Sequence, residues 1–350
     1  MRIEQLTFTR FIAALFIVIF HYGRDCFLFN NDYVSFIFRQ ANIGVSYFFI
    51  LSGFVMIVAY HKNSKIIFAK YIKNRLARIY PVYLLAIFLV LFSKLFKDIK
   101  FADFFLNILM MQSWIHEKAL TINYPGWSLS VELFFYLSFP FLFNFIYKKN
   151  TLKSIAFWII LFWLLSQIVF YLIVNKVFIT TRIYSVQDIY YNPLMHLNEF
   201  LIGNLAGLYF MSDLSEKRKN YSVHILFMLL VLVLILKFPL GLNYHNGLLA
   251  LIFVPLIVLI SLSTDKLTYL FRKNFFVFLG EISFSIYILQ YPVWSLCSDY
   301  RLNKYFGIDK ESDISLSFFL RLGILIILSS ISYLYFEKPI RNKISKGINN

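Results

Sequence analysis

The chain alternates between long apolar blocks and short segments rich in charge. Each block holds about 16 to 23 residues, which as a helix rising 1.5 Å per residue can cross a hydrocarbon core roughly 30 Å thick. The pattern therefore predicts an all-α protein, a polytopic transmembrane helix bundle. The ten predicted spans are 7–23, 42–60, 79–96, 128–147, 154–174, 192–211, 223–238, 247–262, 275–296 and 316–336.

One further apolar segment, at 104–115, has only about 12 residues, and segments of that length are more often re-entrant or interfacial than spanning. Charge supports this interpretation. Counting the segment as a span would move Lys148 and Lys149 to the outer side and Asp188 to the inner side. We therefore predict a short re-entrant or interfacial segment at 104–115.

Lysine and arginine are distributed unevenly between the two sides that ten spans define. With the N-terminus inside, 21 of the 34 lysines and arginines lie on the inner side and 13 on the outer side. Cytoplasmic loops of membrane proteins carry such an excess, so both termini are predicted to be cytoplasmic. This topology accounts for the net charge of +16. Because the aromatic residues are spread evenly through the spans, no binding of nucleic acid is expected.

The amino-acid composition excludes a soluble protein. Hydrophobic residues make up 60% of the 350 residues and charged residues 15%, against roughly 25% charged in soluble domains. No polar stretch could hold a second core, so 1–340 is predicted to be a single membrane domain and 341–350 a short cytoplasmic tail. The first block lacks a small-residue cleavage site, which indicates a retained helix. Cys26 and Cys297 are expected to be two free thiols, with a disulfide as the alternative.

Two ionisable residues lie in the first predicted span. Arg10 and His21 are eleven residues apart, about 1100° of helical rotation, which places them within about 20° of one face and roughly 16 Å apart along the axis. Ionisable groups in the hydrocarbon region cost several kcal/mol, which makes both residues functional candidates. The alternative is that Arg10 reaches lipid phosphates and that His21 is an ordinary interfacial residue.

Arg75 and Arg78 end the basic loop predicted after the second span. At i and i+3 they share a helical face, and paired guanidinium groups can bind phosphate in bidentate fashion, so a cytosolic polyanion would fit them. The lysines of this loop are expected to contact anionic lipids. Glu132 lies about one turn into the fourth span, at about the depth of His21. Its carboxylate is expected to orient the imidazole and raise its basicity. In a compatible alternative, Ser128 or Ser130 caps the helix and the helix dipole favours Glu132.

Other polar residues in the spans carry weaker predictions. His196 and Glu199, at i and i+3, resemble half of a metal site, but no further ligand follows at a diagnostic spacing, so no metal is expected. Glu281 and Gln290 lie inside the ninth span. The remaining histidines lie at loop edges and are expected to be solvated: His61, His116, His224 and His245.

Several of these residues together resemble the membrane-bound acyltransferase 3 family. Arg10 and His21 match the family's R-x10-H motif. Five further segments resemble family motifs in the same order: GVSYFFILSGF at 44–54, RLARIYP at 75–81, WSLSVE at 127–132, ISFSIY at 282–287 and FEKPIR at 336–341. Two residues depart from the pattern, because the family often has an acidic residue at the position of Ser46 and a histidine near Gln290. Some relatives carry a fused extracytoplasmic hydrolase-like domain, for which this chain is expected to have no room.

The resemblance implies an acyl-CoA-dependent O-acetyltransferase of the bacterial inner (plasma) membrane. Acyl-CoA, most often acetyl-CoA, would be the co-substrate, with no metal. The acceptor would be a hydroxyl of a cell-surface or lipid-linked glycan, such as a lipopolysaccharide O-antigen or an exopolysaccharide. With the predicted topology, Arg10, Arg75 and Arg78 would bind the donor phosphates. His21 would be the general base, with Glu132 as its partner.

Other interpretations stay open at this stage. A polytopic transporter or exporter of a lipid-linked glycan would also contain buried charges, although no internal repeat is visible. A membrane scaffold without chemistry would leave the alignment of Arg10 with His21 unexplained. Within the acyl-transfer interpretation, an acyl-histidine intermediate is an alternative to direct transfer. The acceptor could also be a hydroxyl of peptidoglycan, of an antibiotic or of a lipid.

Overall fold

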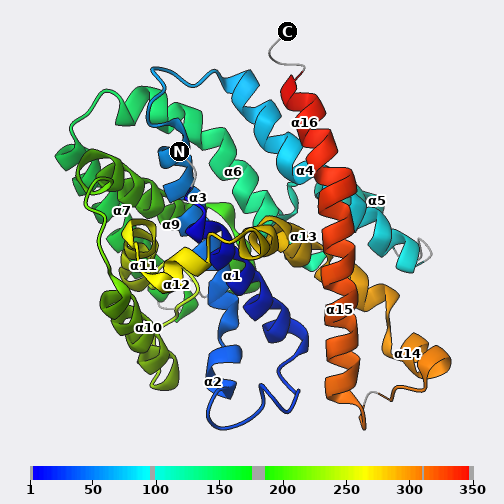
Figure 1. The fold of residues 1–350 in the computed structure, drawn as a ribbon. Coiled ribbons are helices and arrows are strands. Elements are labelled where there is room, and N and C mark those ends of the chain that lie inside the picture. Colours follow the sequence, from blue (N-terminus) through cyan, green and yellow to red (C-terminus); the bar gives the residue numbers. More distant parts are fainter. Residues whose placement is uncertain (1–2, 95–98, 176–185, 310, 347–350) are drawn as a thin grey trace.

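Each of the ten predicted spans coincides with a helix in the computed structural model (Figure 1). The structure describes residues 3–94, 99–175, 186–309 and 311–346. Within these residues there is no sheet, and the one pairing of extended segments is an isolated bridge between Lys219 and Ser263. The prediction of an all-α helix bundle is confirmed.

The helices that match the predicted spans are α1 (Gln5–Tyr22), α3 (Gly44–Tyr60), α4 (Phe68–Ser93), α6 (Trp127–Phe141), α7 (Leu152–Val174), α9 (Pro193–Tyr209), α10 (Ser222–Lys237), α11 (Ala250–Leu262), α13 (Asn274–Leu296) and α15 (Ile314–Ser332). The short helices are α2 (Ser35–Phe38), α5 (Phe101–Ile108), α8 (Val186–Tyr191), α12 (Lys266–Leu270), α14 (Asp299–Phe306) and α16 (Lys338–Lys346). Three 3-10 turns (Ala41–Ile43, Gln112–Trp114, Tyr124–Gly126) and three π-helical turns (Leu142–Tyr147, Phe210–Leu214, Tyr333–Glu337) complete the described structure.

Seven helical segments of the described chain are long and apolar enough to cross a membrane. They contain α1, α3, α4, α6, α7, α13 and α15. The apolar helices α10 and α11 have 16 and 13 residues, which corresponds to about 24 Å and 20 Å and falls short of a full hydrocarbon core. The chain is therefore built as a polytopic membrane protein, while the number of ten spans stays a prediction.

The segment at 104–115 does not form a span. Its helix α5 has eight residues, a length of about 12 Å. The chain then turns at Met110, whose φ of 55° lies in the left-handed region, before the 3-10 turn Gln112–Trp114. This geometry agrees with the predicted re-entrant or interfacial segment.

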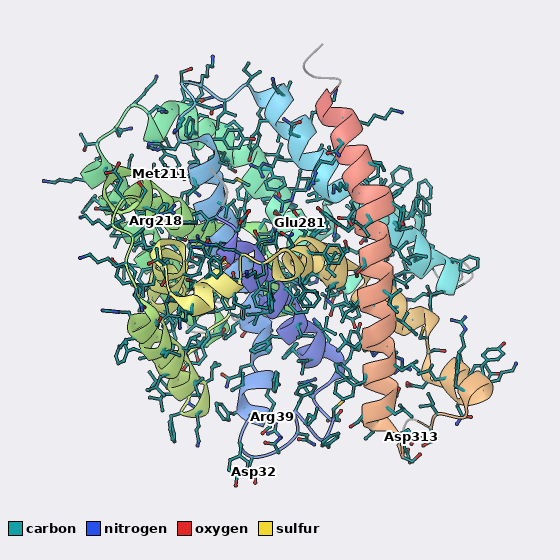
Figure 2. All side chains as sticks on the ribbon, in the orientation of Figure 1. Asp32, Arg39, Met211, Arg218, Glu281 and Asp313 are labelled. Carbon is teal, nitrogen blue, oxygen red and sulfur yellow. The ribbon has the colours of Figure 1, made fainter. Side chains whose placement is uncertain are left out.

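The two ends of the bundle agree with the predicted topology. Ile3 and Arg341, near the two chain ends, line one cavity and so lie on the same side. Figure 1 places α2 at the opposite end of the bundle from α16. Figure 2 shows Asp32, Arg39 and Asp313, all in predicted outer loops, at the end that holds α2.

One predicted boundary is wrong, and a second, that of the C-terminal tail, stays a prediction. The third span was expected to begin at 79, but α4 begins at Phe68, because the lysines and arginines before it lower the hydropathy without opposing a helix. The predicted tail at 341–350 begins inside α16, which follows α15 through the π-helical turn Tyr333–Glu337 and packs against α4. Arg75, Arg78 and Arg341 are therefore all held on helices.

Glycines allow two pairs of helices to touch through their backbones. A Cβ on Gly53 of α3 would lie 2.2 Å from the carbonyl oxygen of Phe200, and one on Gly203 of α9 would lie 2.0 Å from that of Ile50. A Cβ on Gly280 of α13 would lie 1.9 Å from the carbonyl oxygen of Thr7 in α1. Small residues permit such approach in membrane bundles, so α3 with α9, and α1 with α13, form two closely packed pairs.

We expect Gly203→Ala to destabilise the protein by roughly 3 kcal/mol, because the added methyl group forces α3 and α9 apart. Thermal unfolding of the detergent-purified variant measures this. Gly323→Ala is the matched control, since Gly323 lies in α15 and a Cβ there meets nothing within 4 Å. Equal melting temperatures for the two variants would contradict the close contact.

Candidate functional site

Four of the five site residues predicted from the sequence line one cavity. Helices α1, α3, α4, α6 and α13 surround a narrow cavity of about 100 Å³, and Arg10, Arg75, Arg78 and Glu132 lie in its wall. A wide cavity of about 400 Å³ adjoins it on the side of the chain ends. The three arginines line both cavities and therefore stand where the two meet.

Arg75 is held by aromatic rings. Its guanidinium carbon lies 5.4 Å from the ring centres of Tyr60 and of Tyr71, and 5.7 Å from that of Tyr136. Such cation–π contacts stabilise a guanidinium group without using its N–H groups. The Nε atom of Arg75 is buried and has no hydrogen-bond partner. The Nε–H group is therefore available to an anion.

A fourth arginine adds to the positive charge of this region. Arg341 of α16 also lines the wide cavity, which raises the number of arginines around the two cavities to four. Among the described residues, none of these four forms a salt bridge. Paired guanidinium groups of this kind suit a ligand that carries several phosphates.

Carboxylates do line the cavities, but they accept hydrogen bonds from hydroxyl groups. Glu281, which Figure 2 labels on α13, accepts a hydrogen bond of 2.6 Å from the Tyr333 hydroxyl. Glu337 accepts from the hydroxyls of Ser285 and Ser332. Glu132 likewise accepts from a hydroxyl, that of Tyr136 one turn along α6. These contacts fix where the carboxylates lie.

His21 stands apart from the arginines. It is exposed at the end of α1 and lines neither cavity. Its ring centre lies 5.1 Å from that of Phe20 and 5.5 Å from that of Tyr124, whose hydroxyl lies 2.5 Å from the Tyr22 hydroxyl. The neighbours of the imidazole are therefore aromatic rings.

The expected contact between Glu132 and His21 is not formed. Tyr124, which contacts His21, lies in the 3-10 turn that precedes α6. Helix α6 begins at Trp127, and Glu132 lies five residues further along it. Five residues carry it about 8 Å further into the bundle, where it faces the narrow cavity. Glu132 therefore contacts Tyr136 and not His21, while their equal depth stays a prediction.

The 3-10 turn Tyr124–Gly126 links the narrow cavity to His21. Ser128 and Tyr287 lie in the wall of this cavity, and both donate hydrogen bonds to the carbonyl oxygen of Pro125, at 3.1 Å and 3.2 Å. The residue next to Pro125 is Tyr124, which contacts His21. The narrow cavity and His21 thus both border one hydrogen-bonded turn.

The family described as "Acyltransferase domain" matches residues 3–336 of the chain. The protein belongs to the acyltransferase 3 family. Membership of this family confirms the resemblance found in the sequence, and the match covers every residue that lines the two cavities except Glu337 and Arg341.

Individual relatives within the acyltransferase 3 family are distant. The acyltransferase MdmB of Streptomyces mycarofaciens is 30% identical over 159 residues, which are 42% of this chain and 41% of that protein. The O-acetyltransferase OatA of Staphylococcus aureus is 25% identical over 336 residues, 86% of this chain and 53% of that protein. The chain thus spans about half the length of these two relatives. No solved structure matches it.

Some residues of this acyltransferase 3 site were not singled out from the sequence. Arg341 and Glu337 belong to the family motif at 336–341, but the motif had been assigned no role. Tyr136 was noted only as following the motif at 127–132. The spacing of Tyr333, Glu337 and Arg341 by four residues, which places them on one helical face, is the signal that could have revealed them.

A second buried polar cluster lies between α9 and the segment before α11. His196 contacts Glu199 at 2.7 Å through Nδ1 and the Tyr190 carbonyl oxygen at 2.8 Å through Nε2. The ring of His245 lies 5.6 Å from that of His196. His245 is only 8% exposed, so the prediction that it is solvated is wrong. The Ser46 hydroxyl, one of the two departures from the family pattern, donates to the backbone oxygen of His245.

The remaining predictions concern metal and sulfur. Among the described residues, no group of three or more His, Cys, Asp or Glu side chains could hold a metal ion. Gln290, the other departure, is buried and donates to the Tyr287 carbonyl oxygen at 2.6 Å. Cys26 and Cys297 are both free thiols in this structure.

We expect the stability of the protein to fall in mild acid because of His245. Burial, together with the nearby His196, lowers the pKa of His245 from 6.5 to about 3. Below pH 6.5 the unfolded chain therefore binds a proton at His245 that the folded chain does not bind. The free energy of unfolding decreases as the pH falls from 6.5 towards 3. Melting temperatures between pH 7.5 and pH 5 measure this loss.

His245→Asn should flatten this pH dependence, because the titrating group is removed. His224→Ala is the control, since His224 is exposed at the start of α10. If His245→Asn kept the pH dependence of the unchanged protein, the assignment to His245 would be wrong.

Proposed function

We propose that the protein is a membrane O-acyltransferase that moves an acyl group, with acetyl as the first candidate, from cytosolic acyl-CoA to a hydroxyl of a cell-surface or lipid-linked glycan. The observation that carries the proposal is the convergence of Arg10, Arg75 and Arg78 where two cavities meet, with no salt bridge to any carboxylate of the described residues. Membership of the acyltransferase 3 family supports it. The bacterial inner membrane is the proposed location.

The arginines supply the donor site in this proposal. The pyrophosphate of acyl-CoA binds at the junction, where Arg75 and Arg78 come from one face of α4 and Arg10 comes from α1. The pantetheine arm then extends along the narrow cavity. Because this cavity continues to Ser128 and Tyr287, the thioester points towards the 3-10 turn beside His21.

His21 acts as the general base beside this turn. It accepts the proton of the acceptor hydroxyl while the hydroxyl oxygen attacks the thioester carbonyl carbon. The carbon–sulfur bond then breaks, and the departing thiolate of CoA takes up the proton. His21 lies about 16 Å along α1 from Arg10. This one helix therefore places one group at the pyrophosphate and another near the thioester.

Glu132 takes a different role from the one expected from the sequence. It shares the narrow cavity with the three arginines and is held by the Tyr136 hydroxyl. We assign Glu132 to the donor side. There its negative charge offsets part of the positive charge of the three arginines, and the donor phosphates balance the remainder. The acceptor is then activated by His21 without a carboxylate partner.

The proposal is tested by incubating membranes that contain the protein with radiolabelled acetyl-CoA and a lipid-linked glycan fraction. Label in the glycan fraction supports acyl transfer. Membranes with the matched empty vector give the background, and a panel of longer acyl-CoA donors tests the acetyl preference. Absence of label with every donor, although folded protein is present, would favour the transporter interpretation.

A further inference from the structure

The C-terminal segment supplies one face of the wide cavity. Tyr333, Glu337 and Arg341 are four residues apart, and all three line this cavity from the π-helical turn and α16. Glu337 is held by two serine hydroxyls, and Tyr333 donates its hydroxyl to Glu281. Arg341, the third member of this face, is half-buried and interacts electrostatically with both Tyr333 and Glu337.

Arg341 differs in position from the other three arginines. Arg10, Arg75 and Arg78 line both cavities, whereas Arg341 lines only the wide one. A bound polyanion that enters from the side of the chain ends therefore meets Arg341 before it reaches the junction. The wide cavity, at about 400 Å³, also offers about four times the space of the narrow one, at about 100 Å³.

The order of groups in coenzyme A matches this order of positions. The slender pantetheine arm is followed by the pyrophosphate and then by the adenosine, whose ribose carries a 3′-phosphate. With the arm in the narrow cavity and the pyrophosphate at the junction, the adenosine occupies the wide cavity. Its 3′-phosphate then requires a cation that belongs to the wide cavity alone, and Arg341 is the arginine in that position.

We propose that Arg341 binds the 3′-phosphate of the donor and makes the enzyme selective for acyl-CoA over acyl-dephospho-CoA. This inference rests on the proposed function, because it assumes an acyl-CoA donor. A planar guanidinium group can bind a phosphate through two parallel hydrogen bonds, which an ammonium group cannot reproduce. Arg341→Lys should therefore restore only part of the selectivity.

The test compares two donors, acetyl-CoA and acetyl-dephospho-CoA, in purified full-length protein reconstituted in vesicles. The unchanged protein should show a KM that is roughly tenfold to hundredfold lower for acetyl-CoA, as expected for a charge-assisted contact. In Arg341→Ala this preference should disappear, because KM for acetyl-CoA rises to that for acetyl-dephospho-CoA. Lys343→Ala is the matched control, since Lys343 is exposed on α16 and does not line the cavity.

The outcomes separate this inference from the proposed function. Absence of transfer from both donors to any acceptor would overturn the proposed function itself. If transfer occurs and Arg341→Ala prefers acetyl-CoA over acetyl-dephospho-CoA as strongly as the unchanged protein does, only the role of Arg341 is overturned. An equal rise in KM for both donors would also overturn it, because a merely structural role moves both values together.

The same cation could instead bind a phosphate of a lipid headgroup. Vesicles of phosphatidylcholine alone and vesicles with added phosphatidylglycerol distinguish the two sources. A donor preference that depends on Arg341 in both kinds of vesicle supports the 3′-phosphate. An effect of Arg341→Ala that appears only with the anionic lipid would overturn the proposal.

Discussion

Replacing His21 with alanine is expected to lower kcat for acyl transfer by about 10²–10⁴-fold, with little change in the KM for acyl-CoA. The fall in kcat follows from the loss of the group that accepts the proton of the attacking hydroxyl. The constancy of KM follows from the geometry, because His21 lines neither cavity and lies beside the 3-10 turn Tyr124–Gly126. The measurement is the initial rate of glycan labelling at varied acetyl-CoA concentration.

Two controls make this result interpretable. His21 is exposed, so the melting temperature of His21→Ala should stay close to that of the unchanged protein. His224→Ala removes another exposed histidine at the start of α10 and should leave kcat unchanged. Near-full transfer by His21→Ala would exclude His21 as the base. A loss of donor binding in this variant would show that the donor site extends past the turn.

The double variant Arg75→Ala/Arg78→Ala is expected to raise the KM for acyl-CoA by about 10²-fold or more, since each charge-assisted contact contributes roughly 1.5–3 kcal/mol. Both residues line the narrow and the wide cavity, and neither forms a salt bridge with a described carboxylate. Binding of acetyl-CoA to purified protein, followed by calorimetry, measures the loss directly.

Arg75 also needs a control for folding, because its guanidinium group fills a space among Tyr60, Tyr71 and Tyr136. Arg75→Lys keeps the charge and most of the side-chain volume but loses the planar fork, so it should give an intermediate KM. Lys73→Ala removes an exposed cation from the same helix and should have little effect. Unchanged affinity in the double variant would contradict the donor site.

The sequence was sufficient for features that depend on local pattern. Long apolar blocks predict helices because a segment in lipid must form all of its backbone hydrogen bonds within itself. Each predicted span does coincide with a helix. The i, i+3 spacing of Arg75 and Arg78 placed them on one face, and they line the same cavities. The convergence of Arg10 with them could be anticipated because an unpaired charge in a span needs a polar cavity.

Features that depend on contacts between distant segments could not be predicted in this way. The spacing of Glu132 in the sequence could not show which groups it contacts, because the packing of α6 decides that it faces the narrow cavity. His245 follows polar residues and looks solvated, but the segment before α11 folds onto α3 and α9, where Ser46 and His196 contact it. The start of α4 was missed because hydropathy measures burial in lipid and not the tendency to form a helix.

The glycine contacts have a mechanical consequence for turnover. Where a carbonyl oxygen occupies the place of a missing Cβ, as at Gly53 and Gly280, two helices cannot slide past each other without a collision. We therefore expect each pair, α3 with α9 and α1 with α13, to move as one rigid unit. Residues of α1, α3 and α13 line the arginine cavities, which thus lie at the boundary between the two pairs. Shear along this boundary would change the shape of both cavities. The catalytic cycle should accordingly respond to the lateral pressure of the surrounding bilayer.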